Sequence, residues 1–220
     1  IARINDRAIF DFINFHRSYK TPYEAYCIAE ANRRSVPGHT AARKCFEAGG
    51  SERDIMHFFI QGIGVAQQDD PYEPIVAVKD NASILHYQLK SNVKQSGPRS
   101  LLLDAAASFA GYAADITRTY SCEADDFQTL VGRFDDLQRH LVSLATVGTS
   151  FEVLQDQAVF AIGDFMIENQ LATGSPDELD SAGVIEKFYP HALSHFVGLQ
   201  VHDPGGRQLD QSGAVIPPGK

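Results

Sequence analysis

The sequence predicts an α+β fold with an antiparallel sheet. Segments with helical periodicity come first and again after the strands, and the strand-like segments follow one another through short turns rather than through crossover helices. With 220 residues, of which 44% are hydrophobic and 21% charged, the chain can bury a sizeable core as an ordinary globular domain.

Three helices are expected ahead of the first strand. Clustered apolar residues amid polar ones indicate a short helix within residues 1–20. The second begins at Thr21, because Thr-Pro-Tyr-Glu combines a capping residue, a proline at the first helical position and a glutamate three residues after the threonine. Val36-Pro37-Gly38 is expected to kink or break this helix, which resumes over residues 39–48. Ser51 caps the third.

Strands are expected in the middle of the chain. Ile75-Val76-Ala77-Val78 is one, and a Lys-Asp-Asn turn leads to a second over Ser83-Ile84-Leu85-His86-Tyr87. Taken alone, His86 in this strand is interpreted as structural, and Tyr72 as an ordinary loop aromatic. After a hairpin, an apolar helical stripe predicts a helix over residues 123–147, and a further helix follows over residues 151–171.

Two aspartates lie on the arms of the predicted hairpin at residues 101–119. If Phe109 and Ala110 form a two-residue turn, Asp104 falls directly opposite Asp115, where like charges are destabilising unless a proton or a cation lies between them. If the turn shifts by one residue, the carboxylates become diagonal neighbours that still reach one ion. The alternative is that both aspartates lie at the solvated end of the hairpin, and the pattern alone favours neither interpretation.

The composition argues against several classes of protein. The net charge of −9 is opposite to the basic patch that a nucleic acid or a membrane surface would require. No transmembrane run and no secretory signal can be recognised. The three cysteines are few and far apart, which indicates neither a disulfide framework nor a zinc ribbon and favours a reducing, cytoplasmic location.

Three histidines lie within an apolar, glycine-containing stretch at residues 188–206. Imidazole is the commonest metal ligand in proteins, so His191, His195 and His202 are candidates for a site. On one regular strand, His195 and His202 would point to opposite faces, because seven positions separate them. Only one of the two is then expected to share an ion with the aspartates, unless the backbone bends, which Gly198 permits.

Two stretches together resemble the pita-bread metallopeptidases: LLLDAAASFAGYAADITRT, with Asp104 and Asp115 eleven residues apart, and SHFVGLQVHDPGG. Within that group the sequence is most similar to bacterial Xaa-Pro dipeptidases (prolidases), including the variants called organophosphorus acid anhydrolases. The likeness runs from FINFHRSYKTPYEA through PYEPIVAVKDNASILHYQ to the end of the chain. It implies a pita-bread (creatinase/aminopeptidase-like) fold, in which helices flank a curved antiparallel sheet. The C-terminal part of this fold is expected to be missing from the chain.

The resemblance also implies a site with two divalent metal ions, most naturally Mn²⁺. By the resemblance, the metal ligands would be Asp104, Asp115 and His195. The residues that transfer protons in catalysis would be His86 and His202. The residues that contact the substrate would be Tyr72, His191 and His202. Carboxylates with one imidazole suit Mn²⁺-like ions, and two such ions about 3.5–4 Å apart can hold a bridging hydroxide that attacks the scissile carbonyl.

The activity so implied is hydrolysis of dipeptides with a C-terminal proline, with a side activity on organophosphate triesters. Relatives of this kind add two downstream glutamate ligands, an arginine and an N-terminal domain that completes the partner's pocket in a homodimer. We therefore expect residues 1–20 to be a linker helix from a missing N-terminal domain and residues 21–220 to be an incomplete catalytic domain, inactive by itself. The alternatives are an aminopeptidase P, which takes longer peptides, and a metal-free pita-bread binding protein.

One segment departs from the family pattern. The family usually has His-Gly-(Leu/Ile)-Gly-His where this chain has His191-Ala192-Leu193-Ser194-His195. The side chains of Ala192 and Ser194 are expected to tighten the backbone near the metal ions and to reduce activity or shift the substrate preference.

Overall fold

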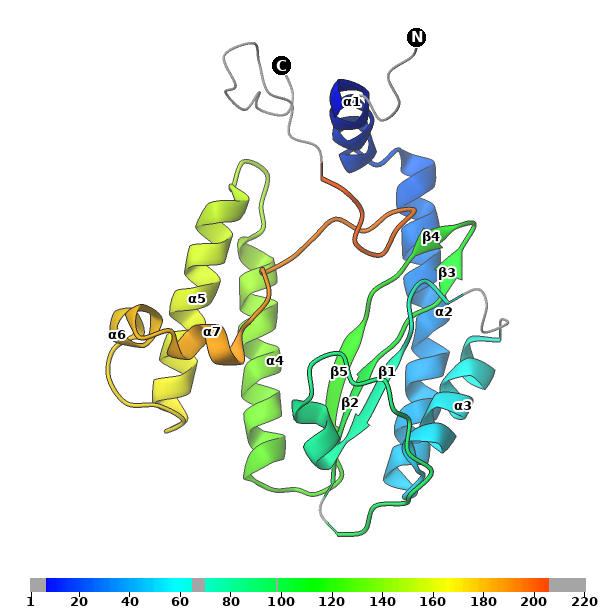
Figure 1. The fold of residues 1–220 in the computed structure, drawn as a ribbon, viewed down its shortest axis with the longest axis vertical. Coiled ribbons are helices and arrows are strands. Elements are labelled where there is room, and N and C mark those ends of the chain that lie inside the picture. Colours follow the sequence, from blue (N-terminus) through cyan, green and yellow to red (C-terminus); the bar gives the residue numbers. More distant parts are fainter. Residues whose placement is uncertain (1–6, 65–69, 98, 206–220) are drawn as a thin grey trace. The chain divides into compact units, whose positions relative to one another are not determined.

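The structure is a computed structural model that describes residues 7–64, 70–97 and 99–205 (Figure 1). Residues 1–6 of the first expected helix lie outside the described residues. The chain divides into two compact units, of which the first combines residues 1–122 with 195–220 and the second comprises residues 123–194. Each unit is described by itself.

The three helices expected at the start of the chain are confirmed. They are α1 (Arg7–Ser18), α2 (Pro22–Glu47) and α3 (Glu52–Ile63). Both predicted caps form as capping boxes, at Thr21 for α2 and at Ser51 for α3. In each box the side chain of the capping residue accepts a hydrogen bond from the third helical N–H, and the carboxylate at that position accepts one from the capping residue.

The predicted break at Pro37 is wrong, because α2 continues through it as one helix of 26 residues. The adjacent Gly38 allows α3 to pack directly on this part of α2. A Cβ atom added at Gly38 would lie 2.6 Å from Ile63, and one added at Gly62 would lie 2.7 Å from the carbonyl oxygen of Pro37. This close packing of two helices offsets the single backbone hydrogen bond that a proline removes.

A three-stranded antiparallel sheet lies beside α2 and α3, in the order β1 (Ile75–Val78), β2 (Ser100–Asp104) and β5 (Thr117–Ser121) (Figure 1). Leu101 and Leu103 of β2 are fully buried and join the main core with apolar residues of both helices. Side chains alternate along a strand, so Asp104 lies on the opposite face from the two leucines.

The second expected strand, over residues 83–87, is wrong. A 3-10 helix, η2 (Lys79–Ser83), follows β1 directly, and the next residues form a turn in which His86 takes a positive φ of 55°. The cause is the buried carboxylate of Glu52. It accepts hydrogen bonds from four donors of this segment, namely Val78 N, Asn81 Nδ2, Tyr87 Oη and Ser91 N, at 2.8 to 2.9 Å.

A hairpin of β3 (Ser108–Phe109) and β4 (Tyr112–Ala113) continues the pairing of β2 and β5. Its turn lies on Ala110 and Gly111, both with positive φ, which is typical of a type I′ turn. The turn predicted at Phe109 and Ala110 is therefore wrong, and the alternative shifted by one residue is confirmed. Asp104 pairs with Thr117, and Asp115 is its diagonal neighbour.

The second unit consists of four helices: α4 (Asp126–Leu144), α5 (Phe151–Glu168), α6 (Pro176–Ser181) and α7 (Val184–Phe188). The two long helices confirm the predictions for residues 123–147 and 151–171, with ends a few residues shorter. The unit has its own core, formed by Ile162, Met166, Leu179 and Ile185. In the described part of the chain, no helix combines the length and the apolar character that crossing a membrane would demand.

Candidate metal centre

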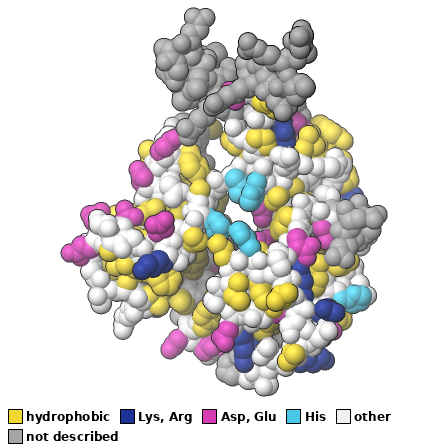
Figure 2. Space-filling view, viewed as in Figure 1, with side chains coloured by type: hydrophobic (Ala, Val, Ile, Leu, Met, Phe, Trp, Pro, Cys, Tyr) yellow, Lys and Arg dark blue, Asp and Glu magenta, His cyan; other side chains and the backbone are white. Residues whose placement is uncertain are grey.

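Asp115, His195 and His202 come together in the first unit. Each offers a ligand atom, and these atoms all lie within 4.8 Å of one another. Asp115 Oδ2 lies 3.0 Å from His195 Nε2, and the rings of His195 and His202 have centroids 4.3 Å apart. Both imidazoles are exposed, and histidine side chains are visible at the surface in Figure 2.

The two histidines meet because the chain reverses between them. Phe196 and Asp203 form an antiparallel bridge, and Gly198 N donates to Gln200 O at the bend. The reversal brings His202 back beside His195. The bend permitted at Gly198 is therefore confirmed, and the limit to one histidine, which was expected only for a regular strand, does not apply. Ala113 N donates to Gly198 O at 2.8 Å, which fastens this loop to β4, close to Asp115.

Asp104 lies on the strand next to this group, in a less hydrated environment. Burial raises the pKa of Asp104, and the nearby charge of Asp115 raises it further, while hydrogen bonds from Tyr72 and Thr117 lower it. The Tyr72 hydroxyl donates to Asp104 Oδ1 at 2.7 Å and accepts from Ile116 N at 3.3 Å. Burial and the adjacent Asp104 raise the pKa of Tyr72, so the hydroxyl stays neutral and can keep donating.

Of the two other predicted histidines, His86 lies near the site and His191 belongs to the second unit. His86 is exposed in the turn after η2, and its charge contributes to lowering the pKa of Asp104. His191 follows α7 and is exposed, as are Ala192 and Ser194. The structure therefore gathers Tyr72, His86, Asp104, Asp115, His195 and His202 in the first unit.

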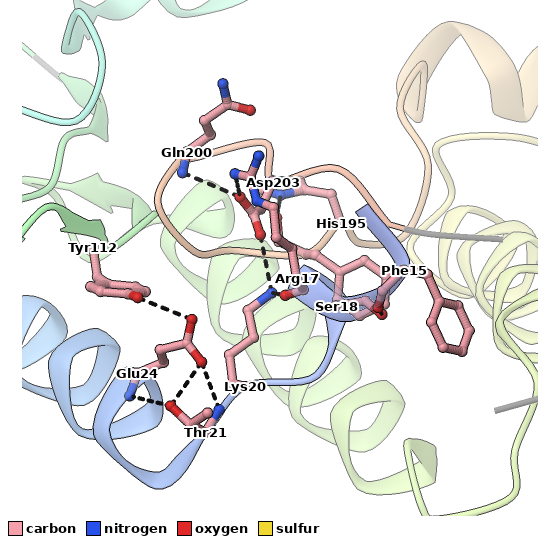
Figure 3. A network of polar contacts seen from close by, with 11 residues as sticks. Phe15, Arg17, Ser18, Lys20, Thr21, Glu24, Tyr112, His195, Gln200 and Asp203 are labelled. Carbon is pink, nitrogen blue, oxygen red and sulfur yellow. Dashed lines mark hydrogen bonds and ion pairs between the residues drawn. The ribbon is translucent and has the colours of Figure 1, made fainter. Parts of the chain in front are cut away.

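Sequence reasoning missed a group of charged residues next to the candidate ligands. Asp203 directly follows His202, and its carboxylate is paired with Arg17 and with Lys20 Nζ at 3.2 Å (Figure 3). The two cations stand at the end of α1 and just after it, so their pairing with Asp203 has no signal in the local pattern. The only available sign was the position of Asp203 beside a predicted site histidine.

The donor set fits divalent cations. A proton or a cation between the diagonal carboxylates would relieve the repulsion that raises the pKa of Asp104, and two imidazole nitrogens lie within reach of Asp115. Oxygen ligands with a minority of imidazoles match Mn²⁺-like ions better than thiolate-preferring ones. Asp115 Oδ2 and His195 Nε2, 3.0 Å apart, are close enough to ligate the same ion.

Carboxylates and imidazoles that converge beside an antiparallel sheet define a candidate metal centre of the hydrolytic kind. The model of metallopeptidase family M24 matches residues 26–220, and the chain therefore belongs to this family.

Curated relatives agree with this assignment. The chain is 41% identical over 212 residues to an Xaa-Pro dipeptidase of Shewanella amazonensis, covering 96% of this chain and 48% of that protein. It is 40% identical over 215 residues to an Xaa-Pro dipeptidase of Shewanella frigidimarina, covering 98% of this chain and 49% of the relative. The chain thus spans about half the length of the curated relatives that it matches.

Solved structures of aminopeptidase P show the same fold. A zinc-substituted Escherichia coli aminopeptidase P in complex with product superposes with a TM-score of 0.80 at 25% identity, covering 95% of this chain and 48% of that one. Proline aminopeptidase P II from Yersinia pestis gives a TM-score of 0.76 at 24% identity, covering 94% and 48%. The pita-bread fold predicted from the sequence is confirmed.

Proposed function

We propose that this chain is part of an Xaa-Pro dipeptidase and carries the first half of its metal centre. The observation that carries the proposal is the convergence of Asp115, His195 and His202 within 4.8 Å, in a chain of the M24 family whose similar relatives are named Xaa-Pro dipeptidases. In this proposal residues 1–20 are a linker helix and residues 21–220 are an incomplete catalytic domain.

Asp104, Asp115 and His195 would hold two divalent ions, which we propose to be Mn²⁺. When bound, such a pair supplies an activated water molecule and polarises a carbonyl group. Tyr72 and Thr117 keep Asp104 oriented by hydrogen bonds to its carboxylate, of which the one from Tyr72 is made to Oδ1. The diagonal position of Asp104 and Asp115 supports this proposal, because it places both carboxylates on one side of the hairpin.

The exposed imidazoles are available for the substrate. His202 lies against His195, and in this proposal it donates a hydrogen bond to a group held at the centre, or exchanges a proton with it, rather than holding an ion. We propose the same role for His86 and contact with the substrate for Tyr72 and His191. A peptide bond to proline has no N–H, so recognition must rest on the free amino group, the ring and the carboxylate of the dipeptide.

A second candidate function is that of an aminopeptidase P. The superposition on Escherichia coli aminopeptidase P is the observation behind it, and the fold is shared by enzymes acting on dipeptides and by those acting on longer peptides. The greater identity to Xaa-Pro dipeptidases supports the first candidate. A homodimeric state, a cytoplasmic location and a side activity on organophosphate triesters complete the proposal.

The test is hydrolysis of Leu-Pro by the full-length protein in the presence of Mn²⁺. We expect turnover that is lost in Asp104→Asn and retained in Asp135→Asn, which removes an exposed carboxylate paired with Arg139 on α4. His195→Gln should lose bound metal, whereas His202→Gln should keep it and lower kcat. Preference for a tripeptide with proline in second position would favour the aminopeptidase P candidate. A folded protein that neither binds Mn²⁺ nor cleaves either peptide would contradict both.

A further inference from the structure

We infer that Asp203 is a positioning residue for the metal centre, and that Arg17 and Lys20 lock it in place so that His195 and His202 both face Asp115. The inference rests on the proposed function, because it concerns the assembly of the same centre. It adds that the junction between α1 and α2 is part of the machinery that builds the site.

The carboxylate of Asp203 is buried and is matched by two cations. Its side chain is 2% exposed, and it pairs with Arg17, which is 29% exposed, and with Lys20, which is 16% exposed. Figure 3 shows both cationic side chains directed at Asp203, Arg17 from the end of α1 and Lys20 from just after it. A buried carboxylate needs such partners, since an unpaired charge away from water is strongly unfavourable.

Asp203 fixes the reversal of the loop on which the histidines stand. Its backbone N–H donates to Phe196 O at 2.9 Å, and its side chain accepts a hydrogen bond from Gln200 N at 3.4 Å. It also lies so close to Gly198 that a Cβ atom there would be 2.5 Å from Asp203 Oδ2. The side chain of Asp203 therefore contacts the residues at the bend between His195 and His202 and stabilises the reversal of the loop.

The same junction also holds the hairpin that carries Asp115. Thr21 and Glu24 form the capping box of α2, and Glu24 Oε1 accepts a hydrogen bond from Tyr112 Oη at 3.0 Å (Figure 3). Tyr112 lies on β4, three residues before Asp115. Residues 17–24 thus contact both segments that supply candidate ligands, the histidine loop through Asp203 and the hairpin through Tyr112.

Lys20 makes two further contacts at the junction between α1 and α2. Its ammonium group donates to Arg17 O at 2.8 Å and lies 5.2 Å from the centre of the Phe196 ring, next to His195. His195 in turn has Nδ1 2.9 Å from Phe196 O, which is consistent with an Nδ1–H donor and leaves Nε2 toward Asp115. The path from the cations to the imidazole consists of contacts between neighbouring residues, and such supports orient metal-binding histidines in general.

The test uses the full-length protein and MnCl₂ alone, with the dissociation constant measured by titration calorimetry and the melting temperature measured without metal. Asp203→Asn and Arg17→Gln should each raise the dissociation constant for Mn²⁺ about tenfold or more. Arg17→Lys, which keeps the charge, should recover part of the affinity. Glu52→Gln is the matched control, because it alters another buried carboxylate of the first unit whose hydrogen-bond donors come from residues 78–91.

The control should lower the melting temperature and leave the affinity for Mn²⁺ unchanged within about twofold, whereas a purely structural role of Asp203 would give the same pattern in Asp203→Asn and Arg17→Gln. That result would overturn the inference and leave the proposed function intact. Absence of Mn²⁺ binding in the unsubstituted protein, or binding that survives Asp115→Asn, would instead overturn the proposed function. If Asp203→Asn does not fold, the dissociation constants of Arg17→Gln and Arg17→Lys test the inference, because Arg17 is more exposed.

Discussion

Two loops of the first unit carry histidines, and a single buried carboxylate holds each of them. Glu52 holds the segment from Val78 to Ser91, which includes His86, and Asp203 holds the segment from His195 to itself. Both carboxylates are buried, but their partners differ in kind. Glu52 is surrounded by four neutral donors, whereas Asp203 is paired with two cations.

The origin of the partners explains what each carboxylate does. All four donors to Glu52 come from the loop that it organises, so this residue determines the local path of the chain. The cations that meet Asp203 come from Arg17 and Lys20, which are 186 and 183 residues away in sequence. The neutral donors to Glu52 thus determine the conformation of their own loop, whereas Arg17 and Lys20 determine the position of the histidine loop relative to α1. The first arrangement serves stability above all, and the second serves the geometry of the centre.

The largest effect is expected for Glu52→Ala. It leaves four donors without their acceptor around a buried position, and the free energy of unfolding should fall by about 4 kcal/mol. Urea denaturation followed by far-ultraviolet circular dichroism measures this, with Glu52→Gln expected to lose less because its amide oxygen still accepts. A loss below about 1 kcal/mol in the alanine variant would show that water replaces the carboxylate.

A smaller effect on stability is expected for Asp203→Asn, about 2 kcal/mol by the same measurement. Arg17 and Lys20 are partly exposed, so they recover water when the carboxylate loses its charge. The ranking of the two variants should be the opposite for Mn²⁺ affinity, where Asp203 matters more. If Asp203→Asn destabilised the protein more than Glu52→Ala, the contrast between local and distant partners would be wrong.

The distance in sequence between interacting residues also separates the features that the sequence predicts from those that it does not. The capping boxes at Thr21 and Ser51 lie within four residues and were predicted correctly. The strand expected over residues 83–87 fails because Glu52, more than thirty residues earlier, draws Tyr87 into a turn. Local propensity contains no information on such a partner.

The candidate site shows the same division. The aspartate pair and the histidines were found from motif and spacing, but their exact register depends on Ala110, which takes a positive φ that alanine rarely adopts. A glycine-centred turn is readable, whereas the choice between two neighbouring turns depends on pairing along the whole hairpin. The reversal that joins His195 to His202 likewise depends on Asp203 and its distant cations.

His39 sharpens the comparison, because it is a buried titratable group with no ion pair to any residue that the structure describes. Its Nε2 lies 2.8 Å from Ala105 O, which requires an N–H donor there, and burial lowers its pKa. The unfolded chain therefore takes up a proton first as the pH falls. The contribution of His39 to the free energy of unfolding should stay constant above a pH of about 6.5 and decrease below it.

Urea denaturation at several pH values measures this contribution. His39→Gln should remove the part of the slope below a pH of about 6.5 that belongs to this residue. Arg43→Gln, which removes no histidine, provides the control and should keep this part of the slope. An unchanged slope in His39→Gln would contradict burial as the cause.

The smallest effect is expected for Arg43→Gln, which removes an ion pair with Glu47 on the surface of α2. Both side chains are about half exposed, so the free energy of unfolding should change by no more than about 0.5 kcal/mol. The same denaturation measurement should show the variant within error of the unsubstituted protein. A larger loss of the free energy of unfolding would mean that exposed ion pairs also stabilise the protein and cannot serve as a reference for the buried carboxylates.

The division of the chain bears on how the candidate centre tolerates changes in length. The chain leaves the first unit after Cys122 and returns at His195, so contacts such as Ala113 with Gly198 close a loop that contains the whole second unit. The entropy lost in closing a flexible loop grows only with the logarithm of its length, and each doubling costs about 0.6 kcal/mol. Insertions or deletions in the connections of the second unit should therefore add almost nothing to the entropic cost of bringing His195 to Asp115.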